Sequence, residues 1–331
     1  MVVRRALRNV ASLLLALGLA AALPLTASAR DRVAFTITDL RITESSGLAV
    51  DEGAGGYWTV NDSGDSAVAY GLNTAGKVVG TLKYDAAPID VEAVALHDGR
   101  LYLADIGDNT SDRESVTVYY FDSARPDNRT VDYNSYDFIY PDGSHDAETL
   151  LVDESGRLFV VTKDAEGSVY SAPREPKRSG TNELTRVGSA PPAVTDGTFL
   201  PGGERIALLT YGSIAVLDAK SYKPIGYTTI PAQDQPESLT VSLDGSSLLV
   251  GSEGKRSKVY AVQIPPEETA PTPTPVESSS SDPNPEPDPS EQAAGVESST
   301  GRGRAGTLLA IGLAGIVAVV SGTVVALVRK P

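Results

Sequence analysis

Five residues at one recurring position of the sequence carry side-chain oxygens that suit a hard metal cation. Each begins a short apolar strand of a repeated pattern, and the five are Ser46, Glu92, Glu148, Thr195 and Glu237. If these strands converge on one axis, three carboxylates meet there and repel one another by kilocalories per mole even at an effective dielectric of about 20. Calcium would neutralise them, because it accepts about six to eight oxygen ligands. We therefore predict a calcium site formed by these five residues.

Other ions suit this residue set less well. Zinc is disfavoured because the chain has no cysteine and because His97 falls in a turn expected on the opposite face. Magnesium demands tighter octahedral geometry than a fivefold ring offers. An alternative to any metal site is that the glutamates accept backbone N–H groups where the chain enters the channel, as repeated structural caps.

The loops that follow the second strand of a repeat supply the candidate catalytic residues. Asp62 and Asp65 lie in the segment Asn-Asp-Ser-Gly-Asp (61–65), and Lys163 follows the second strand of the third repeat. A carboxylate such as Asp62 or Asp65 could activate water beside a metal, and Lys163 could hold an anion. The same segment is also ordinary turn chemistry, so both interpretations stay open.

The pattern that positions these residues recurs five times between residues 46 and 264. Successive copies begin 46, 56, 47 and 42 residues apart, close to the roughly 40 to 50 residues of a four-stranded propeller blade. We predict an all-β fold, a five-bladed β-propeller over residues 30–266, with the first strand of each blade lining a central channel. A two-sheet sandwich with accidental internal similarity is the alternative.

The fifth copy lacks a fourth strand, whereas residues 33–40 supply an additional strand before the first copy. Pairing these two parts would close the ring and remove an exposed sheet edge. The sequence therefore predicts that an N-terminal strand completes the last blade.

The two ends carry the pattern of an exported and membrane-anchored protein. Residues 1–29 combine Arg4, Arg5 and Arg8 with an apolar stretch and a small-residue cleavage site, as a signal peptide does. Residues 267–304 are rich in Pro, Ser and Glu and predict a disordered linker. Residues 305–328 are uncharged and long enough for a transmembrane helix, followed by a cytoplasmic tail at 329–331. We expect a single-pass cell-membrane protein with the propeller outside the cytoplasm.

The charge balance narrows the classes of partner. The chain has 43 Asp and Glu against 28 Lys and Arg, a formal net charge of −15. Nucleic-acid binding needs clustered Lys and Arg, so we expect no nucleic-acid partner. Without cysteine there is no disulfide framework and no thiolate nucleophile.

Two resemblances follow from these segments. The order Ser, Glu, Glu, hydroxyl, Glu at the strand starts, with segments 60–65, 91–102 and 237–239, resembles the five-bladed calcium-activated nucleotidases, or apyrases, over about residues 40–264. That resemblance implies a central calcium and nucleotide hydrolysis, but apyrases present an arginine-rich third-blade loop where this chain has Lys163 beside Asp164 and Glu166. Segments 61–65, 105–109 and 146–148 are similar to uncharacterised exported actinobacterial propellers, which implies a fold and no known reaction.

Three functions are compatible with the sequence. The first is a calcium-bound surface binding or interaction module, whose acidic loop face recognises an unknown cell-wall, protein or small-molecule ligand. The second is a metal-dependent phosphoester hydrolase of the nucleotidase kind. The third is a glycosidase that uses Glu92, Glu148 or Glu237 as acid and base, against which the single tryptophan, Trp58, counts. We predict the binding module and keep the phosphoester hydrolase as the alternative.

Overall fold

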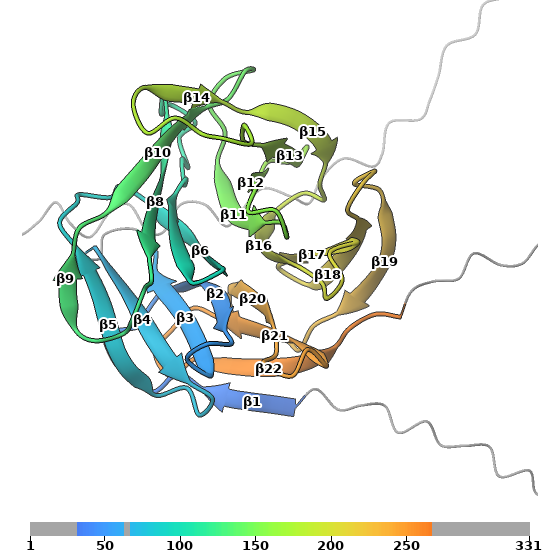
Figure 1. Ribbon diagram of the computed structural model, residues 1–331. Helices are drawn as coiled ribbons and strands as arrows, with labels where there is room; N and C mark the ends of the chain where they lie inside the picture. The colour runs from blue at the N-terminus through green and yellow to red at the C-terminus, as the bar shows by residue number, and fades with distance from the viewer. Residues whose placement is uncertain (1–31, 63–66, 267–331) are drawn as a thin grey trace, which may run out of the picture. The chain divides into compact units, whose positions relative to one another are not determined.

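The computed structural model describes residues 32–62 and 67–266, and every regular element of these residues is a β-strand. The strands form five sheets arranged around a common centre (Figure 1). The prediction of an all-β five-bladed propeller is confirmed. No helix of the described residues is long and apolar enough to cross a membrane. The predicted signal peptide (1–29), linker (267–304), transmembrane helix (305–328) and tail (329–331) lie outside the described residues.

Each blade is built from antiparallel strands, and its first strand lies nearest the centre (Figure 1). Blade 1 contains β2 (Ser45–Asp51), β3 (Gly56–Asn61), β4 (Val68–Asn73) and β5 (Val78–Tyr84). Blade 2 contains β6 (Val91–His97), β7 (Arg100–Asp105), β8 (Val116–Asp122) and β10 (Asn134–Ile139). Blade 3 contains β11 (Ala147–Val152), β12 (Leu158–Thr162), β13 (Ser168–Ser171) and β15 (Thr185–Ser189). Blade 4 contains β16 (Val194–Phe199), β17 (Arg205–Thr210), β18 (Ser213–Asp218) and β19 (Pro224–Thr229).

Blade 5 joins the two ends of the described chain. Its strands are β20 (Pro236–Val241), β21 (Ser247–Ser252), β22 (Lys258–Gln263) and the N-terminal β1 (Arg32–Thr36). β1 pairs antiparallel with β22, from Arg32 opposite Ala261 to Thr36 opposite Lys258. The predicted closure is therefore confirmed, and the first strands of blades 1 and 5 are neighbours at the centre. A closed ring of this kind rules out the sandwich.

Two short strands cross from one blade to its neighbour, which the repeat pattern did not predict. β9 (Arg129–Val131), from the insertion before β10, pairs parallel with β5 of blade 1. β14 (Thr181–Glu183), from the loop before β15, pairs parallel with β10 of blade 2. Each crossing covers an outer edge strand and ties adjacent blades together by backbone hydrogen bonds.

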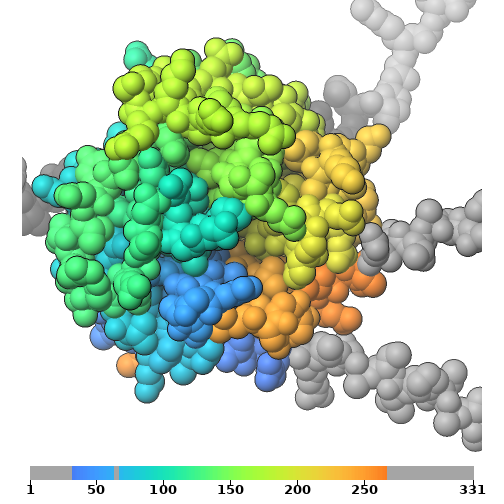
Figure 2. Space-filling model, in the orientation of Figure 1, coloured from blue at the N-terminus to red at the C-terminus, as the bar shows by residue number. Residues whose placement is uncertain are grey.

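The core lies between the blades, where their apolar faces pack against one another. The layer between blades 2 and 3 joins Tyr102, Phe138, Leu158 and Tyr170, all nearly fully buried. Burying a large apolar side chain contributes about 1.5 to 3 kcal/mol. The blades adjoin in chain order around the ring (Figure 2). This packing fixes the first strands relative to one another and so holds the residues at the hub.

Candidate metal centre

A β-bulge interrupts the first strand of every blade, in four blades at the position that the sequence singled out and in blade 1 one residue later. In blades 2 to 5 the pairing of first and second strands skips one residue, in turn Glu92, Glu148, Thr195 and Glu237. In blade 1 the skipped residue is Gly47, next to Ser46. A Cβ on Gly47 would lie 2.8 Å from the backbone nitrogen of Val94 in blade 2, and its φ of 74° favours glycine. Bulges re-aim side chains out of the regular pleat, so this repeated device explains why these positions face the hub.

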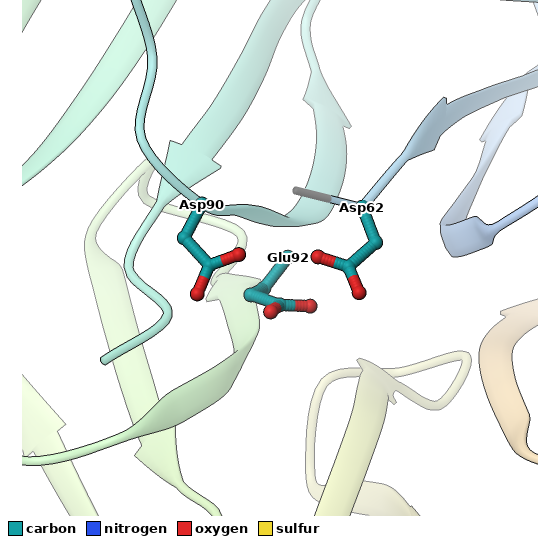
Figure 3. A group of neighbouring side chains, drawn as sticks. All are labelled: Asp62, Asp90 and Glu92. Carbon is teal, nitrogen blue, oxygen red and sulfur yellow. The ribbon is translucent and has the colours of Figure 1, made fainter. Parts of the chain in front are cut away.

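Three carboxylates from blades 1 and 2 meet at the hub. Asp62 follows β3, Asp90 precedes β6 and Glu92 is the bulge residue of β6. One carboxylate oxygen from each lies within 4.8 Å of the chosen oxygens of the other two, and the groups face one another (Figure 3). Calcium–oxygen bonds of about 2.3 to 2.6 Å place two ligand oxygens at most about 5 Å apart. The spacing of this trio is therefore compatible with one shared cation.

The carboxylate of Asp105, at the end of β7, holds the segment that carries Asp90. It accepts hydrogen bonds from the backbone nitrogens of Ile89 (3.0 Å) and Asp90 (2.9 Å). Arg113 forms an ion pair with Asp105 at 2.9 Å and donates to the carbonyl of Gly107 at 2.7 Å. Asp90 is thus positioned by a buried network, and the guanidinium of Arg113 is engaged in that network.

Asn61 has the corresponding role at the end of β3. Its Oδ1 accepts hydrogen bonds from the backbone nitrogens of Thr43 (3.1 Å) and Glu44 (3.3 Å), and its Nδ2 donates to the carbonyl of Arg41 at 2.8 Å. The next residue, Asp62, donates its backbone N–H to the carbonyl of Glu44 at 2.8 Å. The backbone at each loop carboxylate of the trio is therefore held by another polar side chain, that of Asn61 beside Asp62 and that of Asp105 at Asp90.

On the blade 3 side of the hub, Glu148 has a cationic partner. Nζ of Lys163 donates a hydrogen bond to Oε1 of Glu148 and lies 5.6 Å from the ring centroid of Tyr211. Oε2 of Glu148 is buried and has no hydrogen-bond partner among the described residues. Burial raises the pKa of Glu148 to about 7, although the neighbouring ammonium of Lys163 opposes that rise.

Glu237 completes the acidic side chains of the ring. It is 4% exposed. Burial, and then a hydrogen bond with Glu253 in the loop after β21, raise the pKa of Glu237 to about 9. Two carboxyl groups in direct contact repel each other strongly when both are ionised, so this pair holds a proton at neutral pH.

The two hydroxyl members of the predicted ring connect neighbouring blades. Oγ of Ser46 donates to the carbonyl of Glu92 at 2.7 Å, and Oγ1 of Thr195 donates to the carbonyl of Pro236 at 2.7 Å. In each case the partner lies at the first strand of the next blade. A hydroxyl oxygen that donates its proton keeps lone pairs for a cation, so ligation by Ser46 and Thr195 stays a prediction.

The electrostatics of the trio follow from its crowding. Burial, and then the charges of Glu148, Asp62, Asp90 and Glu237, raise the pKa of Glu92 to about 11. Burial, and then the charge of Asp62, raise the pKa of Asp90 to about 6. Without a cation the hub therefore keeps protons at neutral pH, because its carboxylates cannot all be ionised together.

A further carboxylate, Asp196, lies beneath the ring and ties three blades together. Its oxygens accept hydrogen bonds from the backbone nitrogens of Leu239 in blade 5 (2.6 Å) and Gly197 in blade 4 (2.7 Å). The backbone N–H of Leu48 in blade 1 is a third donor. Burial raises the pKa of Asp196 well above its usual range, against the effect of these hydrogen bonds. The channel wall thus offers backbone donors to Asp196, whereas the cap interpretation concerned the glutamates at the blade starts.

The donor set of the hub fits a hard cation. Oδ1 of Asp90, like Oε2 of Glu148, is buried and has no hydrogen-bond partner among the described residues. Such oxygens lose their water without compensation unless a cation or a proton binds them. The described histidines lie elsewhere: Nδ1 of His145 is 2.7 Å from a carboxylate oxygen of Asp164, and His97 lies in the turn between β6 and β7. With oxygen ligands alone, calcium is better suited than zinc or copper.

Of the five predicted ligands, Glu92 is the one that lies in the trio, and its two partners there, Asp62 and Asp90, are outside the five-residue prediction. Asp62, predicted as a catalytic candidate, lies with Glu92 in the trio. Lys163 is paired with Glu148, and Asp65 lies outside the described residues. Asp90 was missed, although the sequence carries a signal for it. The pattern Asp-x-Glu occurs at the starts of both β6 (90–92) and β11 (146–148).

No family model matches the sequence, and no curated protein matches it. Among solved structures, the chain is similar to a gluconolactonase from Xanthomonas campestris, with 12% identity and a TM-score of 0.42. The match covers 71% of this chain and 95% of that chain.

Proposed function

We propose that the protein is a calcium-binding β-propeller that acts as a surface binding or interaction module, with Asp62, Asp90 and Glu92 as the principal ligands of the ion. The observation that carries this proposal is the buried, unpartnered Oδ1 of Asp90 within a trio of carboxylates spaced for one cation. Glu148, with its unpartnered Oε2, is the next candidate ligand. When bound, the ion supplies positive charge that ties blades 1 and 2 together and leaves coordination positions for an oxygen-bearing ligand.

The contacts of Arg113 and Lys163 favour this module over the phosphoester hydrolase. A hydrolase of that class needs cationic groups that are available to hold a phosphate. Arg113 is engaged by Asp105 and by the carbonyl of Gly107, and Lys163 is engaged by Glu148.

Location at the outer side of the cell membrane remains part of the proposal, and it rests on the sequence of residues 1–29 and 305–328.

Calcium titration of the purified chelator-treated protein tests the proposal. We expect one tight site by isothermal titration calorimetry. Because calcium binds the folded state, it should also stabilise that state by about 2.7 kcal/mol at a calcium concentration one hundred times the dissociation constant, and so raise the melting temperature. Asp90→Asn and Glu92→Gln each weaken binding at least tenfold, because each removes a ligand charge. Asp112→Asn, which alters an exposed carboxylate in the loop after β7, is the matched control and leaves binding unchanged.

Two results would contradict the proposal. Absence of calcium binding, with a melting temperature that calcium does not shift, removes the metal site. If the protein hydrolyses nitrophenyl phosphate in a calcium-dependent way and Glu92→Gln abolishes this activity, the protein is a hydrolase and not a binding module.

A further inference from the structure

The face opposite the acidic hub has a second opening of the central channel. A cavity of about 630 Å³ lies there, lined by residues from the ends of the first strands and the following turns of all five blades. Cavities of about 300 to 1,000 Å³ are typical of small-molecule sites. None of Asp62, Asp90, Glu92 and Glu148 lines it, so this lower mouth, as we name the cavity, is separate from the candidate metal centre.

The lower mouth has an apolar part because one position of the repeat is apolar in every blade. Four residues after each hub position stand Val50, Leu96, Val152, Phe199 and Val241. All but Leu96 line the lower mouth, and Leu96 lines the narrower cavity of about 190 Å³ next to it in the channel. Val50, Val152 and Phe199 are only half-buried. An apolar surface therefore remains available at the base of the mouth.

The rim is acidic on one side and apolar on the other. Six residues after the hub position, blades 1, 2 and 3 carry Glu52, Asp98 and Glu154, whereas blades 4 and 5 carry Pro201 and Leu243. All five of these residues line the mouth. The three carboxylates are exposed, so a charged ligand can reach them.

The remaining charges at the mouth add to its negative charge but not to this asymmetry. Asp244, on the blade 5 side, also lines it, and hydrogen bonds from Ser242 and Ser246 lower the pKa of that carboxyl to about 2, so it stays ionised. Of the described residues that line the mouth, His97 is the one basic side chain, and its Nε2 lies 3.6 Å from Oδ2 of Asp98. The local potential is therefore negative, and it favours a cation.

The turns that form the rim touch one another and so preform the cavity. A Cβ on Gly156 would lie 3.5 Å from the ring of His97, and a Cβ on Gly203 would lie 2.9 Å from Oε1 of Glu154. The phenol of Tyr57 in blade 1 accepts a hydrogen bond from the backbone nitrogen of Leu243 in blade 5 at 3.3 Å. These contacts join blade 2 to blade 3, blade 3 to blade 4, and blade 5 to blade 1, so the rim is ordered without a ligand. The entropic cost of ordering the rim on binding is therefore low.

We propose that the lower mouth binds a small organic cation with an apolar body, such as a primary amine on a hydrocarbon or aromatic group. The ammonium lies toward Glu52, Asp98 and Glu154, and the apolar body lies against Val152, Phe199 and the rim residues Pro201 and Leu243. This site does not depend on the calcium proposal, because it uses other residues on the other face.

Three isosteric compounds test the proposal on the purified full chain by isothermal titration calorimetry. Phenylbutylamine, phenylbutanol and phenylbutyrate share one apolar body and differ in charge. We expect the amine to bind at least tenfold more tightly than the alcohol, and the carboxylate to bind least. The preference for the amine falls with salt above about 0.15 M, because exposed charges are screened.

Substitutions locate the binding. Glu52→Gln, Asp98→Asn and Glu154→Gln each weaken the amine about two- to fivefold, as expected for exposed ion pairs, and leave the alcohol unchanged. Phe199→Ala weakens amine and alcohol alike. Glu204→Gln, on an exposed blade 4 residue that does not line the mouth, is the matched control. Calcium titration stays normal in all these variants, so the two sites are distinguished.

Several results would overturn the inference. Equal affinity for the three compounds, or no detectable amine binding, contradicts it. Amine binding that survives the three combined carboxylate substitutions in a variant with an unchanged melting temperature also contradicts it. If the combined variant does not fold, the single Glu154→Gln variant decides by the same comparison of amine with alcohol.

Discussion

Raising the pH of the metal-free protein should destabilise it, and Glu148 shows why. In the unfolded chain Glu148 ionises near its ordinary value of 4.5, whereas burial raises its pKa in the folded protein to about 7. Below the lower value both states hold the proton, and the group has no effect on stability. Between the two values the unfolded chain releases the proton and the folded protein keeps it, so stability falls as the pH rises and levels off above about 7.

The size of this loss follows from the two pKa values. The gap between 4.5 and about 7 corresponds to about 3 kcal/mol of unfolding free energy for this one carboxyl group. Glu92 and Glu237, whose pKa values are about 11 and about 9, act in the same direction. Their effects do not add in full, because the groups interact. For a domain of this size, about 3 kcal/mol lowers the melting temperature by about 10 °C.

The assay is thermal unfolding in chelator from about pH 5 to pH 8, with circular dichroism as the signal. The melting temperature should fall across this range, and saturating calcium should flatten the dependence because the ion balances the buried charges. Glu148→Gln should reduce the slope, whereas Glu204→Gln, at an exposed carboxylate, should leave it unchanged. A metal-free melting temperature that is constant or rises from pH 5 to pH 8 would refute the reasoning.

Three further predictions concern single residues. Lys163→Met should raise calcium affinity severalfold by calorimetry, because it frees Oε1 of Glu148 and removes a competing charge; unchanged affinity would place Glu148 outside the ion's reach. Asp196→Ala should cost about 3 to 5 kcal/mol in denaturant unfolding, since three buried backbone donors lose their acceptor, while calcium stoichiometry stays the same. Gly80→Ala should cost about 3 kcal/mol, because its Cβ would lie 1.7 Å from a carbonyl oxygen of the segment that crosses blade 1. Gly226→Ala, with open space around it, is the control, and equal losses in the two glycine variants would contradict the crossing contact.

The sequence predicted the ring of blades because its elements are periodic, and the same periodicity singled out the hub positions. Strands, turns and the position of Glu92, Glu148 and Glu237 recur at a blade's spacing, so a local pattern carries them. The bulge that turns these residues toward the hub is not visible in any one copy. It appears once the register of paired strands is known.

Other features depend on contacts between distant segments. β9 and β14 are short and mostly exposed, and they pair with strands of a neighbouring blade, which no local periodicity predicts. The selection of Asp62 and Asp90 over other loop carboxylates depends on how Asn61 and Asp105 hold their backbones. The pairing of Lys163 with Glu148 likewise follows from side-chain reach within the folded hub.

A crystal structure of the protein grown with calcium would show directly whether the hub binds the ion. We expect one ion bound to carboxylate oxygens of Asp62, Asp90 and Glu92 at about 2.3 to 2.6 Å. A hub that contains only water at saturating calcium, or an ion held by other residues, would contradict it.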